Sequence, residues 1–225
     1  MAKVISTCRD SGTFALTFDD GPYIYENEVS DFLSSRGIHG TFFINGYNYD
    51  CIYDQNIVDQ LRHTFSQGHL IGSHTWSHPD ITTLSAADFN IQLDLVETAM
   101  KKILGVKPRY FRPPFGRIND ENLQILNSRG YKVVTWSFDS GDSTGASTTT
   151  SDQAYDEISK SFPTPQIALN HETHETTASE VSQHAVQVLQ KAGYRLVSVS
   201  ECLGSGRSQD DYYQDIGEPE QRDVS

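Results

Sequence analysis

The sequence lacks several features that mark large classes of proteins. None of its apolar runs approaches the roughly 18–20 residues that a membrane-spanning helix needs. No Gly-x-Gly-x-x-Gly segment follows the first apolar run, which argues against a dinucleotide-binding enzyme. Basic residues are scarce, since 17 Lys and Arg stand against 30 Asp and Glu, and the net charge is −13. Nucleic acids and anionic membranes are therefore unfavourable partners, whereas a neutral or cationic partner stays open.

Cysteine is scarce as well. The three cysteines, Cys8, Cys51 and Cys202, form no Cys-x-x-Cys pair, so a thiolate zinc site is disfavoured. Cys8 and Cys202 lie near opposite ends of the expected domain, and a disulfide between them would close a long loop. The alternative is three free buried thiols. The N-terminus shows no apolar leader, which leaves either a cytosolic protein or one whose signal peptide has been removed.

The chain does contain an alternation of short apolar runs with longer amphipathic stretches. Its 225 residues suit one large domain. The apolar runs predict seven strands, at residues 14–18, 40–44, 69–72, 109–112, 132–136, 166–169 and 194–197. The amphipathic stretches predict six helices, at residues 26–35, 56–66, 85–104, 120–128, 152–161 and 178–191. The longest helix should be capped by Ser85 and end at Gly105.

This order of elements predicts the fold class. About seven strand–helix units favour an α/β fold whose parallel sheet curls into a distorted or incomplete β/α barrel. A doubly wound open sheet is the alternative. Residues 143–151 are small and polar and predict a loop. Residues 204–225 combine Gly, Ser, Pro and excess acid, so we expect a domain over residues 1–203 and an acidic tail over residues 204–225.

Carboxylates and imidazoles follow the predicted strands. Asp19 and Asp20 come directly after the first strand, and one reason to keep two repelling carboxylates together is that one binds a metal while the other acts as a base. His74 and His78 follow the third strand, four residues apart, which would let both reach one metal from a helical turn. Two histidines and one aspartate leave a coordination position open for water, as catalytic zinc sites require. The alternative for the aspartates is a solvated turn.

More polar residues follow the later strands. Arg112 ends the fourth strand, Asp139 and Asp142 follow the fifth, and His171 follows the sixth. His174 is close by in sequence, but no pattern indicates a role for it, and a surface position is the simplest expectation. In a β/α barrel the ends of all these strands face one mouth. The distribution therefore favours a single metallohydrolase site.

Five motifs make the chain resemble the polysaccharide deacetylase family, also called carbohydrate esterase family 4 or the NodB-homology domain. In order, they are TFDDGP at 17–22, HTWSH at 74–78, RPPFG at 112–116, the segment 136–142 with its two aspartates, and LNH at 169–171. The resemblance runs from about residue 4 to residue 203 and is greatest to fungal members that act on chitin. It implies a distorted β/α barrel with a divalent metal.

The resemblance also implies a metal site and a base. Asp20, His74 and His78 would bind Zn²⁺, Co²⁺ or another divalent transition metal. Asp19 would be the general base, and Arg112 would hold it in place.

The acid and the oxyanion donor follow from the same resemblance. His171 would be the general acid, tuned by Asp139, and the backbone N–H of Phe115 would help to hold the oxyanion. One departure concerns Asp142, because the family commonly has Trp directly after it and this chain has Ser143. At that wall of the site the chain therefore departs from the family's pattern.

The implied reaction is hydrolysis of N-acetyl groups of chitin or chito-oligosaccharides, which releases acetate and leaves glucosamine units. Acetylxylan or peptidoglycan as substrate, or a carbohydrate-binding protein without activity, are the alternatives. The resemblance further implies a monomer that is secreted or held in the cell wall, where the Cys8–Cys202 disulfide would be stable. Aromatic side chains on or near the expected mouth loops suit sugar rings, and packing is the alternative, above all for Tyr110 and Trp136. These side chains are Tyr47, Tyr49, Trp76, Tyr110 and Trp136.

Overall fold

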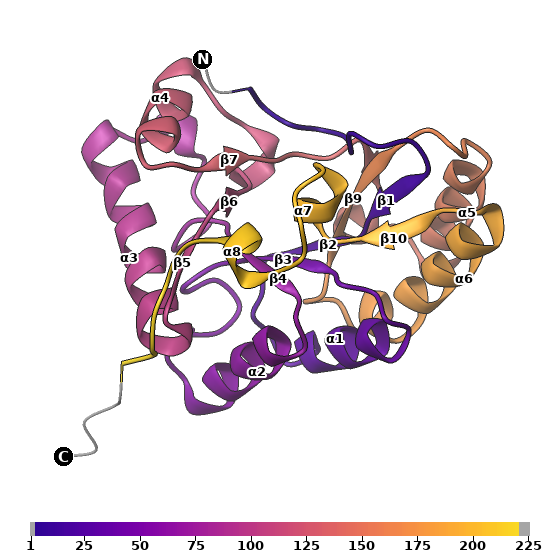
Figure 1. Cartoon of the computed structure of the whole chain (residues 1–225), viewed down its shortest axis with the longest axis horizontal. Coiled ribbons are helices and arrows are strands. Elements are labelled where there is room, and N and C mark those ends of the chain that lie inside the picture. The colour runs from indigo at the N-terminus through magenta and orange to yellow at the C-terminus, as the bar shows by residue number, and fades with distance from the viewer. Residues whose placement is uncertain (1–2, 221–225) are drawn as a thin grey trace.

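Nine strands form one parallel sheet with helices packed around it (Figure 1). The structure is a computed structural model, and it describes residues 3–220. The strands are β1 (Thr13–Ala15), β2 (Thr17–Asp19), β3 (Thr41–Ile44), β4 (Leu70–Ser73), β6 (Tyr110–Phe111), β7 (Lys132–Val133), β8 (Phe138–Asp139), β9 (Gln166–His171) and β10 (Arg195–Val197). Their order is β10-β1-β9-β2-β3-β4-β6-β7, and β8 pairs with β9. The α/β class and the parallel sheet predicted from the alternation are confirmed.

The first predicted strand is divided into β1 and β2. Both halves pair with β9, but the outer neighbour changes from β10 for β1 to β3 for β2. The division falls at Leu16, whose carbonyl accepts a hydrogen bond from the Thr41 N–H. In the register of β2 with β9, Asp19 lies beside His171. Two residues that are far apart in sequence are thus brought together at one end of the sheet.

The predicted helices are present with small shifts of their ends. They are α1 (Glu26–Ser35), α2 (Gln55–Ser66), α3 (Ala86–Leu104), α4 (Asp120–Ser128), α5 (Thr148–Ser159) and α6 (Ser182–Ala192). In Figure 1 they surround the strands, with α3 and α4 on the left, α1 and α2 below, and α5 and α6 on the right. Helix α3 begins where the Ser85 hydroxyl accepts the Asp88 N–H at 3.1 Å and ends at Gly105, whose φ of 76° favours glycine.

Two predicted segments differ from the structure around α5 and α6. The expected loop at 143–151 is wrong for its last residues, because the Ser147 hydroxyl accepts the Thr150 N–H at 3.2 Å and caps α5. Residues 142–144 form a 3-10 turn before it. The expected helix at 178–191 is π-helical over Thr177–Val181 and becomes α-helical only from Ser182.

The segment after Cys202 belongs to the domain for much of its length. Residues 209–216 form α8 (Gln209–Tyr212) and β11 (Tyr213–Ile216), and β11 pairs antiparallel with β5 (Val106–Pro108). Tyr212 and Tyr213 are buried, and the Tyr213 hydroxyl accepts the Ile71 N–H at 3.3 Å. The expected tail is therefore wrong for residues 209–216, since two adjacent aromatic side chains anchor the segment. Residues 221–225 lie outside the described part of the chain.

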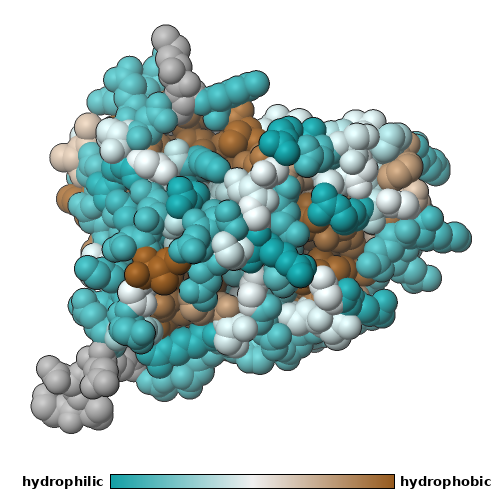
Figure 2. Space-filling model, in the orientation of Figure 1, coloured by the Kyte–Doolittle hydropathy of each residue, from teal (hydrophilic) through white to brown (hydrophobic). Residues whose placement is uncertain are grey.

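A disulfide joins the two ends of the domain. Cys8, which precedes β1, is bonded to Cys202 at the end of α7 (Val199–Cys202), with their Cα atoms 4.7 Å apart, and Cys51 is free. The first of the two cysteine alternatives is thus confirmed. No helix within residues 3–220 has the length and apolarity to cross a membrane. The face in Figure 2 is mostly hydrophilic, with apolar side chains in separate small patches.

Candidate active site

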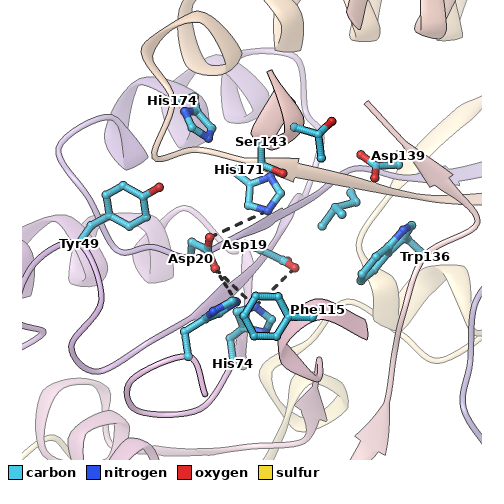
Figure 3. A pocket seen from close by; sticks show the side chains of 13 residues that line it. Asp19, Asp20, Tyr49, His74, Phe115, Trp136, Asp139, Ser143, His171 and His174 are labelled. Carbon is cyan, nitrogen blue, oxygen red and sulfur yellow. Dashed lines mark ion pairs between the residues drawn. The ribbon is translucent and has the colours of Figure 1, made fainter. Parts of the chain in front are cut away.

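A cavity of about 500 Å³ lies where β2, β4 and β9 end (Figure 3). Asp19 and Asp20 reach it from β2 and the turn beyond, His74 and His78 from the loop after β4, and His171 from the end of β9. The carboxyl ends of parallel strands therefore converge on one site, as the distribution of polar residues predicted.

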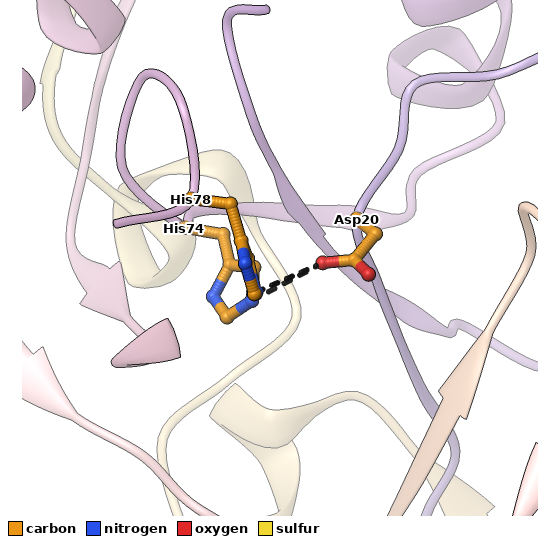
Figure 4. A group of neighbouring side chains, drawn as sticks. All are labelled: Asp20, His74 and His78. Atoms are coloured by element: carbon orange, nitrogen blue, oxygen red, sulfur yellow. Dashed lines mark ion pairs between the residues drawn. The ribbon is translucent and has the colours of Figure 1, made fainter. Parts of the chain in front are cut away.

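Asp20, His74 and His78 form a compact group of three potential metal ligands (Figure 4). One donor atom from each lies within 4.8 Å of the others. The Asp20 Oδ1 is 3.5 Å from the His74 Nε2 and 3.3 Å from the His78 Nε2. That buried oxygen has no hydrogen-bond partner among the described residues. Burial raises the pKa of Asp20, but the close contact with His74 and the charges of His74, His78 and His171 outweigh it and lower that pKa to about 2.

The ligand loop has an unusual backbone. The predicted helical turn between the histidines is wrong, because Thr75 and His78 have positive φ values of 73° and 54°. The side-chain amide of Asn45 holds the loop by donating to the carbonyls of His74 at 2.6 Å and Thr75 at 3.0 Å. Asp20 also has a positive φ, of 76°. Such conformations cost about 1–3 kcal/mol each and are characteristic of functional sites.

The orientation of His74 suits a metal ligand. Its Nδ1 lies 2.7 Å from the carbonyl oxygen of Arg112, so Nδ1 is the donor and the lone pair is on Nε2, which faces Asp20. A carboxylate and two imidazoles are the donor set of catalytic zinc sites with an open position. The unpartnered Asp20 oxygen and the oriented His74 lone pair together fit a divalent transition metal.

Asp19 has a different environment from its neighbour. The Arg112 guanidinium donates to the Asp19 Oδ1 at 2.8 Å and to the Thr17 hydroxyl at 2.6 Å. Arg112 is fully buried, and its charged group lies 4.3 Å from the centre of the Phe43 ring. Asp19 is therefore fixed as a paired carboxylate, while its Oδ2 lies 3.8 Å from the His74 Nε2. The arrangement of Arg112 and Asp19 agrees with the pairing that the resemblance implied.

His171 is bound by Asp142, not by Asp139. The Asp142 Oδ1 lies 2.8 Å from the His171 Nδ1, and the Asp142 Oδ2 accepts the His171 N–H at 2.7 Å. Asp139 is exposed, and its carboxylate accepts the Gly141 N–H at 2.8 Å. Asp139 as the partner of His171 is thus a wrong prediction, because the 3-10 turn at Asp142–Thr144 folds the later aspartate back over β9.

Asp142 changes the charge of His171. Burial lowers the pKa of His171, but the hydrogen bond and the charge of Asp142 outweigh it and raise that pKa to about 9. His171 therefore carries a proton at neutral pH. Its Nε2 lies 4.0 Å from the Asp20 Oδ2, so the proton faces the cavity beside the metal ligands (Figure 3).

Of the five predicted aromatic residues, Tyr49 and Trp136 line the cavity and the other three do not. The Phe115 ring also lines the cavity, where it packs against the His78 ring with centroids 4.6 Å apart. Tyr47 is exposed outside the cavity lining, Trp76 packs against Gly46 and Tyr53, and Tyr110 is fully buried. Figure 3 shows Tyr49 on one side of the cavity and Trp136 on the opposite side.

Sequence reasoning missed several residues that support the site. Thr17 accepts from Arg112, and the Thr177 hydroxyl donates to Asp142 at 2.8 Å. Ser143 and His174 line the cavity, so Ser143 occupies the wall where the family commonly has Trp. Thr17 lies within the TFDDGP motif and could have been found there. Thr177 carries no sequence signal, because only the π-helical turn brings it to Asp142.

Comparison with known proteins agrees with this geometry. Residues 6–134 match the polysaccharide deacetylase family model. The chain is 39% identical to a chitin deacetylase of Pestalotiopsis sp., covering 91% of this chain and 68% of that protein. It is 30% identical to a peptidoglycan-N-acetylglucosamine deacetylase of Bacillus cereus, covering 86% and 69%.

A solved structure extends the similarity to three dimensions. The chitin deacetylase of Colletotrichum lindemuthianum superposes with a TM-score of 0.90 at 32% identity, covering 96% of this chain and 97% of that one. Its structural neighbours in this family have a distorted barrel, the form that the alternation of strands and helices along the chain predicted. The matched family model and these relatives show that the chain belongs to the polysaccharide deacetylase family, carbohydrate esterase family 4, and is a hydrolase of that family.

Proposed function

We propose that this enzyme removes N-acetyl groups from chitin or chito-oligosaccharides and releases acetate. The observation that carries the proposal is the pair Asp19 and Asp20, two adjacent carboxylates with opposite surroundings at one cavity. One is paired with a buried arginine, and the other faces two imidazoles. The named activity of the relatives from Pestalotiopsis and Colletotrichum supports chitin as the substrate.

Asp20, His74 and His78 would hold the metal, for which we propose Zn²⁺. When bound, such an ion supplies a water of lowered pKa and polarises the acetamide carbonyl. Asp19 accepts the proton of the attacking water, since the hydrogen bond from Arg112 holds its carboxylate in place. The Arg112 contact thus holds Asp19 by its Oδ1, while the Asp19 Oδ2 stays on the cavity side, toward His74.

The departing nitrogen needs a proton, and His171 is placed to give it. Its Nε2 faces the cavity, and Asp142 keeps the ring charged. The Phe115 N–H is proposed to donate to the oxyanion, from a residue with a positive φ of 58°. A donor of this kind is worth about 3–4 kcal/mol of transition-state stabilisation.

We further propose a secreted or cell-wall monomer. The Cys8–Cys202 disulfide supports an oxidising compartment. An excess of carboxylates also suits a neutral polymer that becomes cationic as acetyl groups are removed.

The test is acetate release from N-acetylglucosamine oligomers by metal-stripped protein, with and without added Zn²⁺ or Co²⁺. Release that depends on the metal supports the proposal. Asp19→Asn should keep the metal and lose turnover, so a near-normal rate in this variant would contradict the assignment of Asp19 as the general base. Release of acetate from acetylated xylan or peptidoglycan but not from chitin oligomers would contradict chitin as the substrate. Metal binding without release from any of the three would indicate a binding protein.

A further inference from the structure

The Asp142 carboxylate accepts three hydrogen bonds, and one of its donors lies outside the five sequence motifs. The Asp142 Oδ1 lies 2.8 Å from the His171 Nδ1, and the Asp142 Oδ2 accepts the His171 backbone N–H at 2.7 Å. The third donor is the Thr177 hydroxyl, which donates to the same Oδ2 at 2.8 Å. The two contacts on Oδ2 fix the orientation of the carboxylate and leave Oδ1 for the imidazole.

Thr177 takes this position because the chain makes a π-helical turn over Thr177–Val181. The backbone N–H of Ser182 donates to the Thr177 carbonyl five residues back, and the Ser182 hydroxyl donates to the same carbonyl at 2.7 Å. Ala178 and Val181 of this turn are buried in the hydrophobic core, so packing holds the turn as well. π-Helical turns are rare and are frequent at functional sites. This one delivers a hydroxyl to the partner of the general acid.

The position of Thr177 excludes direct contact with the substrate. Its side chain is fully buried and is not part of the cavity lining. It can therefore act on the reaction only through Asp142, and through Asp142 on His171. Burial raises the pKa of Asp142, but the contacts with His171 and Thr177 outweigh it and lower that pKa. A hydrogen bond to such an ionised oxygen is roughly twice as strong as one between neutral groups.

We propose that Thr177 is a positioning residue for the proton transfer to the departing nitrogen. Its hydroxyl holds Asp142 against the His171 Nδ1–H, which directs the Nε2 proton into the cavity. In the transfer, this proton passes to the nitrogen as the bond from nitrogen to the acetyl carbon breaks, and the ring becomes neutral. Without Thr177, the Asp142 Oδ2 keeps only the His171 backbone N–H, and the carboxylate can turn away from the ring. This inference rests on the proposed function, since it concerns the acid of that reaction.

The test compares two acetyl substrates, because only one of them needs the acid. An amine is a poor leaving group until it is protonated, whereas p-nitrophenolate leaves without a proton. Thr177→Val keeps the shape of the side chain and removes the hydroxyl. For N-acetylglucosamine oligomers its kcat should fall about tenfold, with KM and zinc content unchanged. Its rate with p-nitrophenyl acetate should stay nearly normal, and Thr177→Ser should recover most of the lost rate with the oligomers.

Two further measurements isolate the hydroxyl. Thr176→Val is the matched control, because it makes the same change at the neighbouring exposed residue and should leave both rates unchanged. A proton NMR spectrum of the zinc-loaded protein needs no substrate. The Nδ1–H proton of His171 should give a downfield resonance in the wild type and in Thr177→Ser, and this resonance should be lost to solvent exchange in Thr177→Val.

The outcomes separate this inference from the proposed function. An equal loss with both substrates in Thr177→Val would mean that the hydroxyl supports the whole site and not the acid, and would overturn the inference. An unchanged kcat with the oligomers, or the same loss in Thr176→Val, would overturn it as well. If the zinc-loaded wild type releases no acetate from the oligomers, the proposed function fails. An unchanged Nδ1–H resonance in Thr177→Val would then still overturn the positioning role by itself.

Discussion

Strand β4 has a buried histidine at each end, and the two differ in almost everything but residue type. His69 precedes the strand, and His74 follows it. Both ring nitrogens of His69 are used by the protein, since Nδ1 accepts the Gly40 N–H at 3.0 Å and Nε2 lies 3.0 Å from the Ser30 carbonyl oxygen. Only Nδ1 of His74 is used in this way, and its Nε2 faces the carboxylates at the cavity.

The difference shows that a buried histidine has to be judged by its nitrogens and by the end of the strand at which it lies. At the amino end, the ring links α1 to the start of β3 and is structural. At the carboxyl end, one carbonyl partner leaves a lone pair free for a metal. His171, at the carboxyl end of β9, has a carboxylate partner instead and is therefore protonated. The partner on Nδ1 thus distinguishes a ligand from an acid.

The largest expected effect comes from removing the His74 side chain, whose Nε2 faces the cavity at the carboxyl end of β4. His74→Ala should abolish tight zinc binding and lower kcat/KM by about 10³-fold or more, because the site loses one of three ligands. Zinc content after dialysis and acetate release would measure both. His69→Gln is the matched control and should keep its zinc. Stoichiometric zinc in His74→Ala at wild-type affinity would contradict the assignment of His74 as a ligand.

The next effect tests the carboxylate partner of His171. Asp142→Asn removes the charge that keeps the ring protonated, so kcat should fall by about 10²-fold. Asp139→Asn, three residues earlier, should have a much smaller effect, since Asp139 bonds only to the turn that follows it. Zinc content should be unchanged in both variants. A larger loss in Asp139→Asn than in Asp142→Asn would reverse the correction made from the structure.

The residues of the site could be predicted from the sequence better than the ends of the domain. The carboxylates and imidazoles follow strands that were recognisable as apolar runs, and parallel strands bring their carboxyl ends together. The positions of the strands were therefore enough to predict that four residues lie at one cavity, namely Asp19, Asp20, His74 and His171. It was not enough to choose between Asp139 and Asp142, because both follow the same strand and only a 3-10 turn separates their directions.

Tertiary pairing explains the errors outside the site. Composition made residues 204–225 look like a tail, but Tyr213 fills a space between β4 and α2 that no local pattern reveals. The strand β5 was missed for the same reason, since its three residues pair with β11 from more than a hundred positions away. Short elements of this kind depend on their partners and not on their own periodicity.

The smallest expected effect concerns His69 and appears in stability rather than in rate. Burial lowers the pKa of His69 to about 4, although the Ser30 carbonyl and Asp31 favour its proton, and the charges of His39 and His63 oppose it. The unfolded chain therefore binds a proton that the folded chain does not between about pH 6.5 and 4. The stability that the neutral ring provides is complete above this window and is lost as the pH falls through it.

Urea unfolding at several pH values, for the wild type and for His69→Gln, measures this term. The free energy of unfolding of the wild type relative to the variant should be greatest near pH 7 and should fall by roughly 2–3 kcal/mol toward pH 4. Other groups titrate in the same range, but they do so in both proteins and cancel in the difference. Parallel curves would mean that His69 takes up its proton without cost in the folded state. In that case His69 at the amino end of β4 would not be a neutral ring held by two backbone contacts, because a ring that takes up a proton in place has lost its acceptor contact with the Gly40 N–H.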